Sequence, residues 1–126
     1  MAYLLKTEPD VYSIDDLERD GETIWDGVGN PQALGYLARM PVGEKLVIYH
    51  TGKERSAVGL AKCVAVNAEN PKAPEVRIKF VKKLKTPRTL AEMKAMKLFA
   101  DSALVKHGRL GVVPLTAAQY AWIAGS

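Results

Sequence analysis

The stretch Trp25-Asp26-Gly27-Val28-Gly29-Asn30-Pro31 places an aromatic residue, an acid, two glycines and a helix-start signal next to one another. Asn30 before Pro31 predicts a helix with the asparagine as its N-cap and proline in its first turn. The two glycines allow positive φ or a close approach of the backbone to another group. The segment therefore predicts either a small pocket, with an aromatic face beside the positive end of a helix dipole, or a tight strand-to-helix turn with Trp25 in the core.

The composition indicates a single globular domain over residues 1–126. Hydrophobic residues make up 48% of the chain and charged residues 25%, as is usual for soluble proteins. No apolar run has the length of a membrane-spanning helix, and Met1–Lys6 lacks the basic region of a signal peptide. We therefore expect a cytoplasmic monomer without a membrane partner.

The charge is distributed unevenly along the chain. Residues 1–63 carry 7 Lys/Arg and 10 Asp/Glu, a net charge of −3, whereas residues 64–126 carry 11 and 4, a net charge of +7. Such a basic half suits a polyanion such as DNA or RNA, although a solvated surface without a partner has the same composition. The candidate phosphate-binding residues are clustered in the basic half: Lys79, Lys82, Lys83, Lys85 and Arg88.

Apolar periodicity and capping signals predict strands and short helices in mixed order. We expect strands at 3–7, 23–25, 45–50, 57–66, 75–84 and 110–114, and helices at 14–20, 31–39, 90–96 and from 116 to about 123. Capping motifs begin at Ser13, Thr89 and Thr116, and 98–106 has no clear pattern. Gly59 indicates a bulge or a barrel corner. This order predicts an α+β fold, a small, partly closed mixed β-barrel with short peripheral helices.

Residues typical of metal, cofactor and nucleophilic sites are few. No His and Cys spacing matches a zinc site, and no phosphate-binding glycine loop of the common types occurs. The single cysteine, Cys63, lies among aliphatic residues, where burial should raise the pKa of its thiol. We therefore predict no cofactor, no metal and no catalytic residue.

Polar residues at the ends of two predicted strands are the better site candidates. Lys6, Thr7 and Glu8 end the first strand, where a lysine can bind a phosphate and a carboxylate can accept hydrogen bonds from a base. His50 ends another strand and would reach the same rim. The alternatives are a solvated Lys–Glu pair and an ordinary strand-end histidine.

Four motifs in order make the chain similar to a known family. They are 5–10 (LKTEPD) with 12–17 (YSIDDL), 25–30 (WDGVGN), Tyr49-His50, and 108–110 (GRL) with Val112, Pro114 and Leu115. Each is weak alone, but together they extend over nearly the whole chain. With them the chain resembles the EVE domain family, the thymocyte-nuclear-protein-like branch of the PUA superfamily.

This resemblance implies a PUA-like barrel that binds nucleic acid and holds a modified, flipped-out base in a pocket. The pocket would be lined by Lys6, Thr7, Glu8, Ser13, Trp25, Gly27, Val28, Asn30 and His50, with Arg109 nearby or supporting the fold. The chain departs from the family pattern at Thr7 and Gly111, where serine is usual, and at Gly29, where a basic or larger polar residue is usual.

Three functions follow from these patterns. The first is a non-enzymatic domain that reads a modified base in DNA or RNA, with Trp25 as the stacking surface. The second is an enzyme acting on a nucleotide, with His50 as base and Glu8 as its partner, for which the chain offers no nucleophile or metal site. The third is a module that binds a small molecule or a protein through the same pocket.

Overall fold

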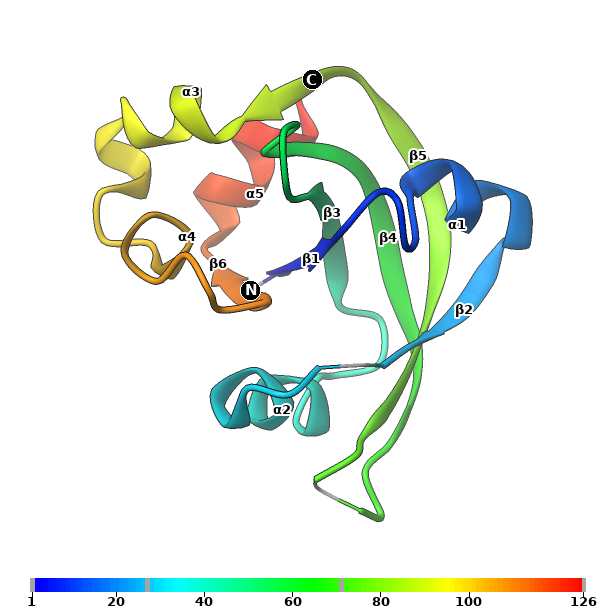
Figure 1. Cartoon of the computed structure of the whole chain (residues 1–126). Coiled ribbons are helices and arrows are strands. Elements are labelled where there is room, and N and C mark those ends of the chain that lie inside the picture. The colour runs from blue at the N-terminus through cyan, green and yellow to red at the C-terminus, as the bar shows by residue number, and fades with distance from the viewer. Residues whose placement is uncertain (1, 27, 71, 126) are drawn as a thin grey trace.

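The computed structural model describes residues 2–26, 28–70 and 72–125, and within them one mixed sheet is flanked by short helices (Figure 1). The strands are β1 (Ala2–Thr7), β2 (Glu22–Trp25), β3 (Lys45–His50), β4 (Ser56–Asn67), β5 (Glu75–Thr89) and β6 (Val112–Leu115). The helices are α1 (Ile14–Asp20), α2 (Pro31–Ala38), α3 (Leu90–Lys94), the 3₁₀ turn η1 (Lys97–Phe99), α4 (Ala103–Lys106) and α5 (Ala117–Ala124). No helix in the described ranges is long and apolar enough to cross a membrane.

The sheet is open, which corrects the expected β-barrel while the α+β class is confirmed. The strand order is β2-β5-β4-β3-β1-β6, with β1 and β3 parallel and the other pairs antiparallel. In the described ranges no pairing joins the two outer strands, β2 and β6, each of which has only four residues. Helix α2 contacts β4 and β5 and also the outer strand β6, so it bridges strands near both ends of the open sheet.

The predicted capping motifs are confirmed at three helices. The hydroxyl groups of Ser13, Thr89 and Thr116 each accept a hydrogen bond from the backbone N–H three residues further on. In each case the side chain at that third position accepts a hydrogen bond from the backbone N–H of the capping residue. Each cap is worth about 1 kcal/mol, which matters for helices of only five to eight residues.

Gly59 brings helix α1 close to the sheet. The β4–β5 register shifts between Ala57 and Gly59, so the predicted irregularity is confirmed. A Cβ atom at Gly59 would lie 2.6 Å from Cγ1 of Ile14, the first residue of α1. Ile14 is buried, and the missing side chain of Gly59 is what allows it to sit directly on the strand.

Candidate nucleic-acid interface

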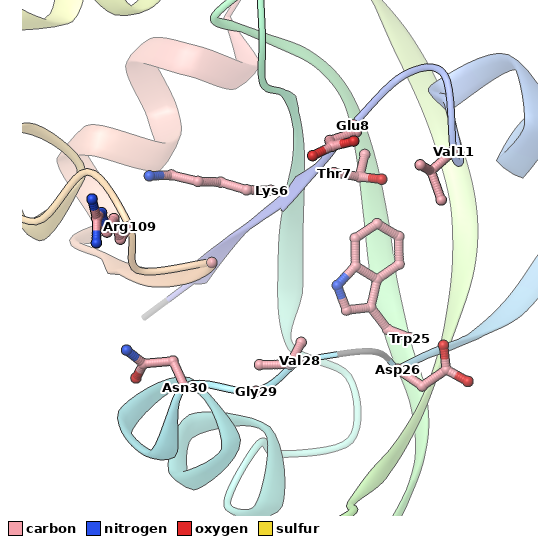
Figure 2. A pocket seen from close by; sticks show the side chains of 11 residues that line it. Lys6, Thr7, Glu8, Val11, Trp25, Asp26, Val28, Gly29, Asn30 and Arg109 are labelled. Carbon is pink, nitrogen blue, oxygen red and sulfur yellow. The ribbon is translucent and has the colours of Figure 1, made fainter.

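A cavity of about 530 Å³ lies beside the opening of the sheet (Figure 2). Its walls come from the end of β1 and the loop after it, the end of β2 and the segment leading into α2, and the segment before β6. The volume is within the usual range for a ligand site. It is lined by Lys6, Thr7, Glu8, Val11, Trp25, Asp26, Val28, Gly29, Asn30, Arg109 and Gly111.

Trp25 belongs to the core and to the cavity wall at once. Its side chain is 7% exposed, and its ring packs edge-on against Tyr12 with centroids 6.3 Å apart. The indole N–H faces the cavity in Figure 2 and donates no hydrogen bond within the described residues. Among the described residues, the buried side-chain nitrogen atoms without a partner do not include this one, so it is open to solvent and available to a ligand. The ring thus lines a cavity, and its contact with a base stays a prediction.

Asn30 caps helix α2 as predicted and leaves its amide group for the cavity. Its Oδ1 accepts hydrogen bonds from the backbone N–H groups of Gln32, at 2.8 Å, and Ala33, at 3.2 Å. This fixes the orientation of the amide, whose NH₂ is turned away from the helix (Figure 2). The α2 end of the cavity therefore presents hydrogen-bond donors and the positive end of a helix dipole.

Two cations line the wall beside the segment that leads into β6. The Lys6 ammonium donates to the carbonyl oxygen of Gly108 at 3.0 Å, and burial lowers the pKa of Lys6. The backbone N–H of Lys6 donates to the carbonyl of Gly111 at 2.9 Å, which extends the β1–β6 pairing to the residue before β6. Arg109 is exposed beside Lys6 (Figure 2). This wall suits a phosphate or another anionic group.

The wall formed by the end of β1 presents hydrogen-bond acceptors. The Thr7 hydroxyl donates to the carbonyl of Tyr12 at 2.8 Å, which leaves its oxygen able to accept. The Glu8 carboxylate is exposed and makes no hydrogen bond or ion pair to the described residues. A free carboxylate can accept a hydrogen bond from the exocyclic amine of a cytosine.

Two residues expected in the pocket lie outside it. Ser13 caps α1, and its hydroxyl accepts from Asp16. The His50 side chain is buried, Nε2 accepts from the Ile14 N–H at 3.0 Å, and Nδ1 lies 3.1 Å from Oε1 of Glu54. These bonds hold His50 under the start of α1 instead of at the rim. The remaining expected residue, Gly27, lies outside the described residues.

Four lining residues were absent from the expected set: Val11, Asp26, Gly29 and Gly111. Asp26 and Gly29 stand within one motif, whereas Gly111 and Val11 adjoin motifs, Val11 as an apolar residue in an otherwise polar turn. The conformational role expected of Gly29 is wrong, because its φ is not positive and a Cβ there would meet no atom within 4 Å. Its small size instead leaves open space at the cavity wall.

The lysines of β5 form an exposed basic strip, defined here as Lys79, Lys82, Lys83 and Lys85. Lys83 pairs with Asp15 at 2.6 Å, and the hydrogen bond to that carboxylate raises the pKa of Lys83. The other three make no ion pair with any described residue. They are therefore available to an external anion.

The basic strip leads away from the cavity along one strand. Trp25 is paired with Val76 in the β2–β5 ladder. At about 3.3 Å per residue, Lys79 lies roughly 10 Å and Lys85 roughly 30 Å along the strand from that pair. Arg88 does not belong to the strip, because its guanidinium lies 4.4 Å from the centroid of the Trp122 ring and donates to the Trp122 carbonyl. Arg88 thus holds α5 against β5.

The prediction for Cys63 is confirmed. The side chain is fully buried in β4, and burial raises the pKa of the thiol. Over the described residues, no group of three or more His, Cys, Asp or Glu side chains is arranged to hold a metal ion.

Comparison with known proteins gives the family. The model of the EVE domain matches residues 1–126. Thymocyte nuclear protein 1 from Danio rerio is 29% identical over 96% of this chain and 69% of its own length. The NMR structure of a protein from Rhodopseudomonas palustris is 34% identical, with a TM-score of 0.90 over 98% of this chain and 90% of that one.

A further solved structure is a complex. The crystal structure of human thymocyte nuclear protein 1 with DNA containing 5-methylcytosine is 28% identical to this chain, with a TM-score of 0.88 over 98% of this chain and 95% of that one. The similarity thus extends along the full length of the sheet and its helices. The chain belongs to the EVE domain family.

Proposed function

We propose that this chain is a non-enzymatic nucleic-acid-binding domain that holds a modified base, flipped out of DNA or RNA, in the cavity beside Trp25. The observation that carries the proposal is the Trp25 ring, which lines the cavity and presents an indole N–H without a partner in the described residues. The complex of human thymocyte nuclear protein 1 with DNA containing 5-methylcytosine supports it.

Different walls of the cavity bind different parts of the nucleotide. Flipping a base out of its stack costs a few kcal/mol, and contact with an aromatic surface returns about 1–3 kcal/mol. Glu8 accepts from the exocyclic amine of the base, while Lys6 and Arg109 on the other wall bind the phosphate of the flipped nucleotide. The open space at Gly29 lies on the same wall segment as Val28 and accommodates a substituent on the base.

The basic strip provides affinity without sequence preference. Its exposed lysines bind successive phosphates and release counterions, so affinity falls with salt for every sequence alike. The cavity then supplies the preference for a modified base. We place no catalysis here because His50, the base of the alternative enzyme function, is buried outside the cavity that Glu8 lines, and the Cys63 thiol is also buried outside it.

The test is a binding panel of otherwise identical oligonucleotides that carry either cytosine or 5-methylcytosine at one position, as DNA and as RNA. We expect tighter binding to the modified member of at least one pair, and Glu8→Gln should reduce that preference. If every modified oligonucleotide in a panel of modified bases binds with the same affinity as its unmodified counterpart, the domain does not recognise a modified base. Binding of free nucleosides but of no oligonucleotide would instead favour a small-molecule module.

A further inference from the structure

Val11 is an apolar side chain that the fold does not use. It is 75% exposed, more than Val42 or Val81, the other large exposed hydrophobic residues of the described chain. It does not pack against the hydrophobic core. The loop that carries it is fixed by its backbone, because the N–H groups of Val11 and Tyr12 both donate to the Glu8 carbonyl at 2.9 Å. A hydrogen-bonded turn therefore holds a valine side chain in solvent.

The position of Val11 beside the cavity suggests a function for its exposed side chain. Val11 lines the cavity close to Trp25, and in Figure 2 it stands on the opposite side from Lys6 and Arg109. A second cavity, of about 470 Å³, shares Val11 and Trp25 with the first. Val11 thus lines two neighbouring hollows, and its exposed side chain stands beside the aromatic wall that a base would contact.

The charges near Val11 indicate which part of a nucleic acid meets it. Glu8 and Asp10 precede it in the same loop, both are exposed, and neither makes an ion pair within the described residues. Carboxylates repel phosphates, so the backbone of the ligand belongs on the cationic wall. The part that contacts Val11 must be the uncharged faces of the bases.

We propose that Val11 is a wedge that enters the base stack of a duplex beside the flipped nucleotide, so that the partner of this domain is double-stranded. The inference rests on the proposed function. Apolar side chains inserted between base steps hold duplexes open in other proteins, and a flipped base leaves such a gap behind it. A single strand has no opposite strand to re-form the pair, so the wedge contributes little to binding it.

The experiment compares Val11→Ser with Val42→Ser, which removes the same apolar groups from a residue that is 66% exposed and lies in the turn after α2. Three probes carry one 5-methylcytosine: a paired duplex, a duplex mismatched at that position, and the single strand. We expect Val11→Ser to weaken binding of the paired duplex about five- to tenfold, the mismatched duplex less, and the single strand hardly at all. Val42→Ser should match the wild type on all three probes.

A fluorescent 2-aminopurine next to the modified base reports unstacking directly. The wild type and Val42→Ser should raise its emission in the duplex, and Val11→Ser should raise it less. Equal affinity of Val11→Ser and wild type for the paired duplex, or an equal loss on duplex and single strand, overturns the wedge and leaves the proposed function standing. Equal binding of modified and unmodified oligonucleotides by the wild type, in every pair of the binding panel described above, overturns both.

Discussion

Replacing Trp25 with leucine should weaken binding of a modified base and also destabilise the fold. The ring is 7% exposed and belongs to the core cluster, so it contributes to folding as well as to the cavity. Removing a buried tryptophan entirely costs about 3–5 kcal/mol, and leucine retains part of the apolar volume, so we expect a loss of roughly 2 kcal/mol. For a domain of this size that lowers the melting temperature by about 8 °C.

The loss of binding must be separated from the loss of folded protein. Stacking of a base on an aromatic side chain is worth about 1–3 kcal/mol, which predicts a roughly five- to hundredfold lower affinity for the modified oligonucleotide. Phe99→Leu is the matched control, because Phe99 is fully buried and packs on Trp122, away from the cavity. It should lower the melting temperature by a similar amount and leave affinity unchanged.

The two variants are compared by calorimetry and by titration well below both melting temperatures. Affinity is expressed per folded molecule, with the folded fraction taken from the same melting curves. If Trp25→Leu binds as tightly as Phe99→Leu and the wild type, Trp25 has only a structural role. The assignment of the stacking surface would then be wrong.

Three further perturbations test other parts of the structure. Gly59→Ala forces a Cβ to within 2.6 Å of Ile14 Cγ1 and should lower the free energy of unfolding, measured in urea, by about 1–3 kcal/mol. An unchanged urea midpoint would mean that α1 moves aside without loss of stability. The double variant Lys82→Gln with Lys85→Gln should reduce the magnitude of the slope of log affinity against log salt by about 2. The ratio of the affinities for modified and unmodified oligonucleotides should stay unchanged. An unaltered slope would mean that the basic strip is a solvated surface without a role in binding. Hydrogen bonding from the Thr89 backbone lowers the pKa of Glu92 below its ordinary 4.5, so the contribution of Glu92 to stability is present above pH 4.5 and is lost as the pH falls through the lower folded pKa. The melting temperature should therefore decrease less steeply from pH 6 to 3 for Glu92→Gln than for the wild type. Parallel curves of melting temperature against pH would contradict this.

Local sequence signals predicted where helices and strands lie better than they predicted which strands pair with one another. The helix from Ile14 to Asp20 and the strand from Lys45 to His50 have the expected bounds, because capping boxes and continuous apolar runs depend only on neighbours in sequence. β5 continues to Thr89 instead of ending near 84, because β4 pairs with it as far as Ser56. That pairing depends on two distant segments, and no local pattern reveals it.

The site could be predicted where its residues follow one another in the chain. Asn30 and Trp25 stand in one motif, and the motif itself forms a wall of the cavity. His50 ends a strand as Lys6 nearly does, and the same argument placed both at the rim. Its Nε2 instead accepts a hydrogen bond from the Ile14 N–H at 3.0 Å, so the side chain lies away from the rim. Which buried group a histidine satisfies depends on how α1 sits over the sheet, and that packing is not visible in the sequence.

The failure of the sheet to close is what creates the cavity. A closed barrel would hydrogen-bond the free edge of β2 to the free edge at the other end of the sheet, β6. Trp25 ends β2 and Gly111 directly precedes β6, and both line the cavity, so strands paired across the opening would occupy the space that the cavity fills. Helix α2 instead bridges β5 and β6 and presents its N-terminus to that space. The outer strands have only four residues each, and their shortness leaves open the space that the proposed function assigns to a flipped base.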